Sequence, residues 1–346
     1  MSDAPRSDVG HPLAEAAGIH AMPLPTPFPV GDINAWLIDD EPLTLVDTGP
    51  STAEALVAVE RGLAAHGRRI EDLERILLTH EHADHVGLTA ILAERSGAEV
   101  VTLDLLAPRI ADPVPAFGRE TRFTASVLER HGVPREVVVA LVPLQRAHAA
   151  FGSGPVDVAR MVADGDRLAF AGRTLEVLHR PGHSMTDTIF VDRQRDLAIG
   201  GDHLLGAISS NPLMGCPPER LTSGDPPTAD DRVRTLPLYG RSLDATAELD
   251  PAVILAGHGG AVTDAPALVA ERHRQTDRRK RKIAALLPED RGATAFEIGT
   301  RMWGDTAVEQ PLLVVSEVLG HLDLLLEDGT VAVERHDGVD RWTPTG

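Results

Sequence analysis

Three histidines and two acids follow directly on an apolar run in the first third of the chain. The run, residues 75–79, is typical of a buried strand, which places His80 and His82 on the loop at its carboxyl end. Side chains alternate along extended backbone, so both imidazoles point to one side and can bind the same ion. Asp84 and His85 come where the loop turns into a helix, and they can face a second ion. Imidazole and carboxylate ligands suit zinc, and also iron or manganese.

Three further polar residues follow apolar runs in the same way, each beside a glycine. They are His183, Asp202 and His258. Glycine lets the backbone turn sharply and approach a metal or a substrate closely. Any one of these residues alone would be an ordinary polar loop residue. Four strand ends with one shared pattern predict a metal site, because the carboxyl ends of strands form the edge where α/β sheets place ligands.

Apolar patterning predicts the elements that must position these side chains. Strand-like and helical stretches alternate from residue 34 to residue 103, which is β-α-β-α-β order and indicates an α/β fold. The strands are expected at 34–39, 43–47, 75–79 and 99–103, and the helices at 51–67 and 85–97. Further strands are expected at 167–170, 174–180, 186–192, 196–202 and 252–259, with a helix near 231–249.

Two regions differ from this alternation. Residues 105–165 show helical patches without a clear strand, and we expect an insertion lying over one edge of the sheet. Residues 265–346 predict three helices and a hairpin around Asp337-Gly338, which together make a small winged-helix-like module. The predicted organisation is therefore a loose leader at 1–20, a catalytic domain at 21–264 and a winged-helix-like domain at 265–346.

Composition narrows the classes of function. The formal net charge of the 346 residues is −19, which argues against nucleic acid or an anionic membrane as the general partner. Cys216 is the single cysteine, so an internal disulfide is excluded and a reducing compartment is indicated. No apolar run reaches the roughly 18 residues of a membrane span, and the N-terminal stretch lacks the pattern of a signal peptide. We expect a cytoplasmic protein.

The motifs THEHADHVG, PGHS, GGDH and AGHG, in this order, resemble those of the metallo-β-lactamase-fold hydrolase superfamily. The resemblance covers roughly residues 22–262 and implies an αββα sandwich with a dinuclear site. It implies that His80, His82 and His183 hold the first ion, that Asp84, His85 and His258 hold the second, and that Asp202 bridges the two opposite a hydroxide. Asp47, in LVDTG, matches an early acidic residue of the superfamily that supports the ligands from behind.

A second resemblance concerns the C-terminal region. The basic helix with ERHRQTDRRKRKI and the module after it resemble the LACTB-like subgroup, which implies either a thioesterase-like enzyme or an endoribonuclease. Tyr239 opens a helix where this subgroup often carries a tyrosine near the active-site mouth, and His203 adjoins Asp202. We therefore expect substrate contacts from Tyr239 and His203. Glu81 alternates with two ligands and should point away from both ions.

Two ions about 3.5 to 4 Å apart activate a hydroxide and polarise a substrate oxygen, so the predicted reaction is metal-assisted hydrolysis. We expect Asp84 to act as the catalytic carboxylate that orients the hydroxide. The first choice of substrate is an ester, thioester or lactone, and the alternative is RNA or another phosphodiester. The cations of residues 272–282 could hold the phosphates of coenzyme A or of a nucleic acid; otherwise they form a solvated helix face. The expected partner is a small-molecule substrate, and a coenzyme A or other phosphate group on it is one option. A homodimer is one option for the assembly.

Overall fold

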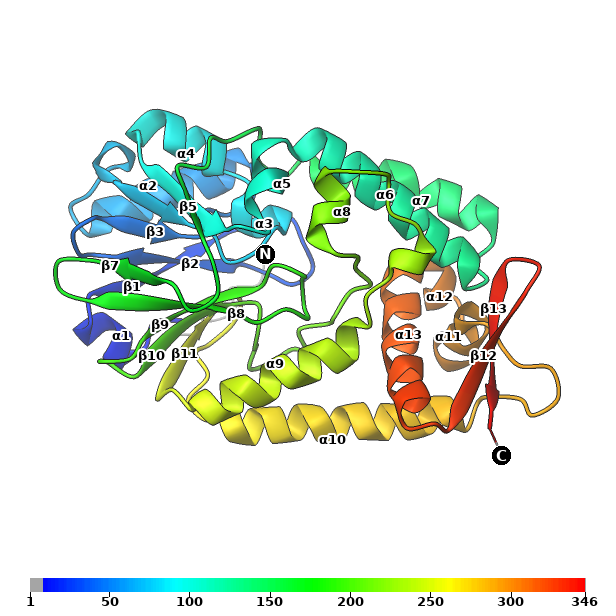
Figure 1. Ribbon diagram of the computed structural model, residues 1–346. Coiled ribbons are helices and arrows are strands. Elements are labelled where there is room, and N and C mark those ends of the chain that lie inside the picture. The colour runs from blue at the N-terminus through cyan, green and yellow to red at the C-terminus, as the bar shows by residue number, and fades with distance from the viewer. Residues whose placement is uncertain (1–8, 346) are drawn as a thin grey trace.

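Two β-sheets packed face to face form the body of the protein, and helices cover both outer faces (Figure 1). The structure is a computed structural model that describes residues 9–345. A smaller group of helices with a two-stranded hairpin stands at one end of this sandwich. The predicted αββα sandwich with a small C-terminal helical domain is therefore confirmed.

The first sheet has six strands in the order β1-β2-β3-β4-β5-β6. They span Ile19–Leu24, Ile33–Ile38, Thr44–Val46, Arg75–Leu77, Glu99–Leu103 and Arg160–Val162. Strands β1, β2 and β3 pair antiparallel, whereas β3 to β6 pair parallel. The parallel half sends the carboxyl ends of β3, β4 and β5 to one edge, where the histidine-rich loop begins.

The second sheet has five strands in the order β11-β10-β9-β8-β7. They span Val253–Ala256, Leu197–Gly201, Thr188–Asp192, Thr174–His179 and Arg167–Ala169. Strand β10 pairs parallel with β11 and antiparallel with β9. The loops that follow β10 and β11 therefore leave the sheet side by side.

Apolar residues on alternating positions build the layers. In β2, Trp36 packs between the sheets with Phe190 and Val253, whereas Leu37 packs outward with Val59. Helices α2 (Ala53–Ala65) and α4 (Thr89–Ser96) cover the first sheet, and α9 (Thr235–Leu249) and α10 (Ala265–Ala284) cover the second. The predicted helix at 85–97 is divided into α3 (Ala83–Val86) and α4.

The insertion contains three helices and one strand. Helices α5 (Ala107–Ala111), α6 (Pro113–Arg130) and α7 (Arg135–Ala149) lead to β6, which extends the first sheet as its edge strand. The expectation that residues 105–165 lack a strand is therefore wrong. Only three residues form β6, and two of them are exposed, so the stretch carries no alternating pattern.

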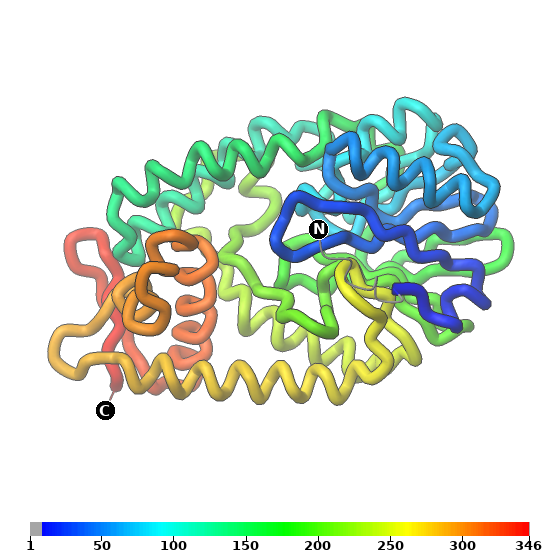
Figure 2. The backbone as a smooth tube through the Cα atoms, turned by 180° about the vertical axis from the view of Figure 1, so that it is seen from behind, coloured from blue at the N-terminus to red at the C-terminus, as the bar shows by residue number. Residues whose placement is uncertain are grey.

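The C-terminal module comprises α11 (Ala295–Trp303), α12 (Thr306–Glu309), α13 (Pro311–Glu327) and the hairpin of β12 (Val331–His336) and β13 (Val339–Pro344). Asp337 and Gly338 form the two-residue turn with φ angles of 50° and 82°, as their residue types predict. Helix α10 runs from the sandwich into this module (Figure 2). Packing also crosses the predicted boundary at 264, because α6 shares one apolar core with α11 and α13. The winged-helix relationship stays a prediction.

The N-terminal segment differs from the expected loose leader. Residues 1–8 lie outside the described part of the chain. Helix α1 (Pro12–Ala16) and the start of β1 fall within the predicted leader, and Ala14 and Ile19 are fully buried there. The remaining short elements are α8 (Pro218–Thr222) and two 3-10 turns at Ile70–Asp72 and Ala229–Asp231. Among residues 9–345, no helix combines the length and the apolar character needed to cross a bilayer.

Candidate metal centre

Loops at the ends of four strands bring the predicted metal-binding side chains together. The loop after β4 carries the first four of them, and the segments after β8, β10 and β11 carry one each. Their ligand atoms fall into three groups, each within 4.8 Å. The groups are His80, His82 and His183; Asp84, His85 and His258; and His80, His85 and Asp202. The first two groups correspond to the two predicted ion sites.

Asp202 lies between the two groups of histidines. Its Oδ1 is 3.4 Å from His85 Nε2, whereas its Oδ2 is 3.5 Å from His258 Nε2 and 3.7 Å from His183 Nε2. Each carboxylate oxygen therefore faces an imidazole of a different strand end. This is the placement expected of a carboxylate shared by two ions.

The chemistry of the cluster fits bound metal. The buried atoms of residues 9–345 without a hydrogen-bond partner include His85 Nε2, His258 Nε2 and Asp202 Oδ1, and buried polar atoms normally have a partner. The backbone also leaves room for the cluster at Gly257, where an added Cβ would lie 2.3 Å from Asp202 Oδ1. Ligand atoms without other partners, next to a backbone position that has room only for glycine, are the arrangement expected of a metal site.

Electrostatics favour the metal-binding protonation states of four proposed ligands. Burial, reinforced by neighbouring imidazoles, holds the pKa of His80 well below its usual value and lowers the pKa of His183 to about 4. Burial alone would raise the pKa of Asp84 and of Asp202, but nearby histidines reverse this effect and lower both pKa values. These imidazoles are thus neutral and these carboxylates ionised near neutral pH, which are the forms that bind metal. At His85 and His258 burial opposes the charged form, but nearby carboxylates, among them Asp202, raise the pKa of both imidazoles above its usual value.

Asp47 supports the cluster from behind, as the resemblance implied. It has a positive φ of 59°, which is uncommon for a residue other than glycine. His85 Nδ1 donates to Asp47 Oδ2 at 2.7 Å, and the Thr79 hydroxyl donates to the same oxygen at 2.8 Å. Thr79 Oγ1 also lies 3.0 Å from His80 Nδ1. One carboxylate therefore orients His85 directly and His80 through Thr79.

Glu81 belongs to none of the three ligand groups, although it lines the same cavity as several of the ligands. The hydroxyl of Thr186 donates a hydrogen bond to Glu81 Oε2. Thr186 follows His183 in the chain, so this bond joins the loop after β4 to the loop after β8. Sequence reasoning did not single out Thr79 or Thr186, although Thr79 immediately precedes the first histidine.

The structure argues against the expected substrate contacts of Tyr239 and His203. His203 is 1% exposed, and its Nε2 lies 2.8 Å from the Thr246 hydroxyl on α9. The Tyr239 hydroxyl donates to the backbone carbonyl of His203 at 2.7 Å. Both side chains are buried, and each forms a hydrogen bond to the segment that carries the other. They therefore position the backbone after Asp202. The sequence shows neighbours along the chain but not which polar atoms already have partners.

A large cavity opens at the metal cluster. Its volume is about 690 Å³, and His82, Asp84, His183, Asp202 and His258 lie in its wall. The rest of the wall is mainly apolar and comes from the loop between β1 and β2, α5, α6, the end of α7 with the loop after it, the segment 213–221 and the start of α13. Among residues 9–345, Arg109 is the one arginine in this wall, and it pairs with Glu120 at 2.8 Å. A substrate here would meet apolar surface and little uncompensated positive charge.

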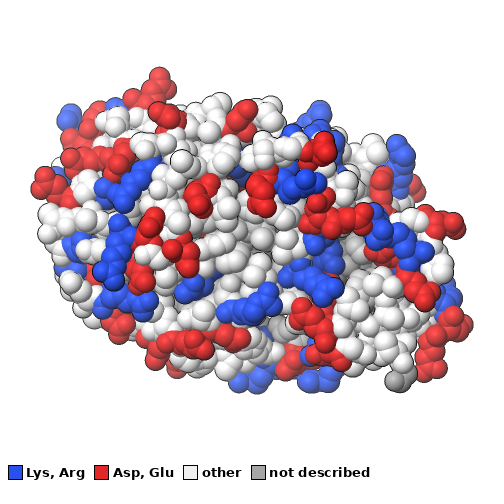
Figure 3. Space-filling model, in the orientation of Figure 1, with Lys and Arg blue, Asp and Glu red and all other residues white. Residues whose placement is uncertain are grey.

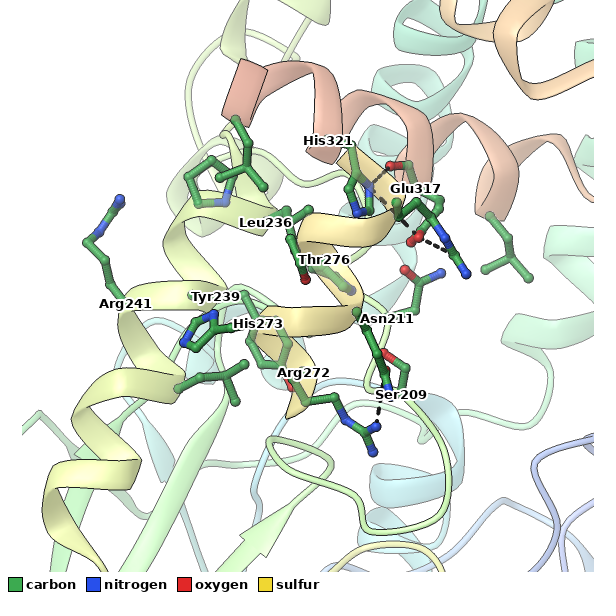
Figure 4. A pocket seen from close by; sticks show the side chains of 18 of the residues that line it. Ser209, Asn211, Leu236, Tyr239, Arg241, Arg272, His273, Thr276, Glu317 and His321 are labelled. Carbon is green, nitrogen blue, oxygen red and sulfur yellow. Dashed lines mark hydrogen bonds and ion pairs between the residues drawn. The ribbon is translucent and has the colours of Figure 1, made fainter. Parts of the chain in front are cut away.

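The basic helix α10 lies beside a second hollow, of about 570 Å³, between α9, α10 and α13 (Figure 4). Most of its cations have partners: Arg272 donates to the carbonyls of Leu205 and Ile208 at 2.8 and 2.9 Å, and Arg279 pairs with Glu317. Arg278 pairs with Glu271 and Lys280 with Asp328. In the face shown in Figure 3, acidic and basic side chains are likewise interleaved. The expectation of a phosphate-binding cluster is therefore not supported, and the solvated-face alternative fits these pairs.

An αββα sandwich with histidines and aspartates at its strand ends defines a class of metal-dependent hydrolases. The chain belongs to the Metallo-beta-lactamase superfamily, whose family model matches residues 28–258. It is 32% identical over 310 residues to the probable metallo-hydrolase YqjP of Bacillus subtilis, covering 88% of this chain and 91% of that protein. It is 27% identical over 210 residues to an atrochrysone carboxyl ACP thioesterase of Emericella nidulans, covering 58% of this chain and 59% of that one.

A solved structure extends the likeness beyond the sandwich. The metallo-beta-lactamase family protein TTHA1429 from Thermus thermophilus superimposes with a TM-score of 0.74 at 29% identity. The match covers 94% of this chain and 98% of that chain, so it takes in most of the C-terminal module. Membership of the LACTB-like subgroup stays a prediction.

Proposed function

We propose that the cluster binds two divalent metal ions, with zinc as the first choice and iron or manganese as alternatives. His80, His82 and His183 would hold one ion, Asp84, His85 and His258 the other, and Asp202 both. This division is supported by the grouping of the ligand atoms. Bound divalent ions supply a water of lowered pKa and polarise the oxygen of a carbonyl.

The protein's own residues would orient these ligands and handle a proton. Asp84 Oδ2 lies 3.3 Å from His258 Nε2 and borders the cavity, so Asp84 is the proposed catalytic carboxylate that accepts a hydrogen bond from the attacking water. Asp47 and Thr79 would keep the imidazoles in one tautomer and orientation, as second partners of metal ligands commonly do.

We propose that the substrate is a carboxylic ester or thioester with an apolar acyl group. The observation that carries this proposal is the mainly apolar wall of the cavity that contains Asp84 and Asp202. A phosphodiester would bring negative charge to a wall whose one arginine, Arg109, is already paired with Glu120. The relative from Emericella nidulans is named as a thioesterase, which supports the same class of substrate. Lactones share the acyl chemistry and belong to the same test.

A substrate panel tests this proposal. Protein with measured metal content is assayed on 4-nitrophenyl esters, acyl-CoA thioesters, lactones and bis(4-nitrophenyl) phosphate. We expect turnover of an ester or thioester that a chelator abolishes and added metal restores. Chelator-sensitive turnover of the phosphate diester, without turnover of any acyl substrate, would contradict the proposal in favour of a phosphodiesterase.

A further inference from the structure

The C-terminal module forms part of the wall of the cavity at the metal cluster. Leu312 and Leu313, at the start of α13, line the same cavity as Asp84 and Asp202. They are more than one hundred residues from Asp202 in the chain, so the fold alone brings them to this site. The catalytic loops thus form one end of the cavity, and a separate structural unit forms another part of it.

Several apolar side chains of this cavity lack apolar cover. Val30, Val114 and Leu313 are 39%, 75% and 40% exposed, although large apolar side chains are normally buried. They come from the β1–β2 loop, from α6 and from α13, and all three line the cavity. An apolar ligand would remove them from water together.

Two pairs of polar side chains in this wall are bonded to each other. Arg109 pairs with Glu120, and Thr186 donates to Glu81. Because the lining is mainly apolar, burial of apolar surface is the main contribution that the wall offers to a ligand. An unbranched or aromatic acyl group has this chemistry.

Specific contacts hold the module's part of the wall in place. The backbone N–H of Met214 donates to the hydroxyl of Ser316 on α13 at 3.1 Å, which joins the cavity segment to the helix. Arg232, in the loop before α9, forms two hydrogen bonds of 2.7 Å with Asp323 on α13. The position of Leu313 relative to the metal cluster is therefore defined by the fold.

Leu313 also lines the second hollow between α9, α10 and α13, and it therefore lies between the two cavities. We propose that the C-terminal module sets the length of the acyl chain that the enzyme accepts, with Leu313 as the residue that ends the acyl cavity. This inference rests on the proposed function. A larger side chain at 313 should shorten the space for the chain, and a smaller one should join the cavity to the second hollow.

The test uses the full-length, metal-loaded protein and a series of CoA thioesters from acetyl through butyryl, octanoyl and lauroyl to palmitoyl. In the wild type, kcat/KM should rise by up to about fourfold for each methylene buried, until the cavity is full. Leu313→Trp should lower kcat/KM at least tenfold for the longest chain that the wild type accepts, and change it less than twofold for acetyl. Leu313→Ala should instead raise kcat/KM for chains beyond the wild-type optimum.

Val308→Trp is the matched control, because Val308 is 49% exposed on the neighbouring helix α12 and lines neither cavity. It should leave the chain-length profile unchanged. If turnover occurs but the profiles of both Leu313 variants match the wild type, or the control shifts the profile equally, the inference is wrong.

Calorimetric binding of laurate separates this inference from the proposed reaction. Laurate binding that Leu313→Trp weakens and Val308→Trp does not, in a protein inactive on every acyl substrate, would support the acyl cavity and contradict the proposed hydrolysis. Absence of both turnover and laurate binding would overturn both. Because Leu313→Ala only removes volume at a partly exposed position, it keeps the test available if the tryptophan variant does not fold.

Discussion

A single carboxylate, Asp47, orients two of the proposed ligands through two different routes. It contacts His85 Nδ1 directly and reaches His80 Nδ1 through the Thr79 hydroxyl. Since that hydroxyl donates to Asp47, it is free to accept from His80, which leaves His80 Nε2 for the ion. Thr79 is therefore a positioning residue rather than a catalytic one.

Replacement of Thr79 tests this relay. Thr79→Val keeps the shape but removes the hydroxyl, so His80 Nδ1 loses its acceptor and Asp47 loses a donor. Loss of such a partner typically weakens metal binding by about 10- to 100-fold. Competition with a chromophoric chelator should show this loss for one of the two ions. Thr79→Ser retains the hydroxyl and should bind both ions nearly as the wild type does. Equal metal affinity in the valine variant would remove Thr79 from the site.

The opening motif provides a comparison between two acids three positions apart. Asp84 lies beside His258, whereas Glu81 accepts a hydrogen bond from Thr186 and belongs to none of the ligand groups. Asp84→Asn removes a charge from the proposed ion site and should lower turnover by about a hundredfold or more, since each 1.36 kcal/mol of barrier is roughly tenfold in rate. Glu81→Gln should change turnover by less than about tenfold. If Glu81→Gln were the more damaging variant at full metal occupancy, the ligand assignment would have to be redrawn.

Sequence reasoning identified the candidate ligands because each follows an apolar strand and adjoins a turn. The substrate contacts expected of Tyr239 and His203 stay predictions, and the structure does not favour them for a physical reason. The Tyr239 hydroxyl donates to the carbonyl of His203, and His203 Nε2 lies beside the hydroxyl of Thr246; residue type alone does not reveal such pairing.

At the scale of elements, the α13 helix is joined to the sandwich by a buried ion pair. Asp323 is fully buried and receives two hydrogen bonds of 2.7 Å from Arg232. Asp323→Asn leaves the guanidinium without its counter-charge, and breaking a buried pair in this way typically costs about 3–5 kcal/mol. Urea denaturation should show a loss of this size in the free energy of unfolding.

Glu271→Gln is the control for this prediction. Glu271 pairs with Arg274 and Arg278 on the surface of α10, where such pairs contribute little to the free energy of unfolding. A loss in Asp323→Asn no larger than in this control would show that the buried pair does not hold α13 in place.

Elements with strong periodicity were predicted well, and elements defined by pairing were not. The buried strands β2 and β4 and the Asp337-Gly338 hairpin follow from local pattern. Strand β6 depends on the exposed edge of β5, and β1 depends on pairing with β2. Such strands arise from a partner elsewhere in the chain, which a local pattern does not contain.

At the scale of the whole molecule, three units share one cavity. The sandwich supplies the metal cluster, the insertion supplies α6, and the C-terminal module supplies Leu312 and Leu313. The predicted division into a catalytic domain and a separate module therefore underestimates their contact, since α6 and α13 also share an apolar core. The contact could not be predicted because the segments are far apart in the sequence. The apolar pattern of each segment does not show which other segment packs against it.

Metal removal should affect the stability of the whole molecule. Five of the seven proposed ligands are buried, namely His80, Asp84, His85, Asp202 and His258. Without ions, the fold therefore keeps these ionisable groups away from water and without their proposed partners. Ions that bind the folded chain alone stabilise it by roughly 4 kcal/mol each when the free metal is a thousandfold above Kd.

Scanning calorimetry should therefore show a lower Tm after dialysis against a chelator, and zinc should restore it. The variant Asp202→Asn, which alters the carboxylate proposed to serve both ions, should show a smaller metal-dependent rise in Tm than the wild type. The surface variant Glu271→Gln should keep the full rise. Because the sandwich forms the greater part of the chain and shares its cavity with the C-terminal module, we expect the main transition to shift as a whole. A Tm that is identical with and without metal would contradict two buried ions held by these seven residues.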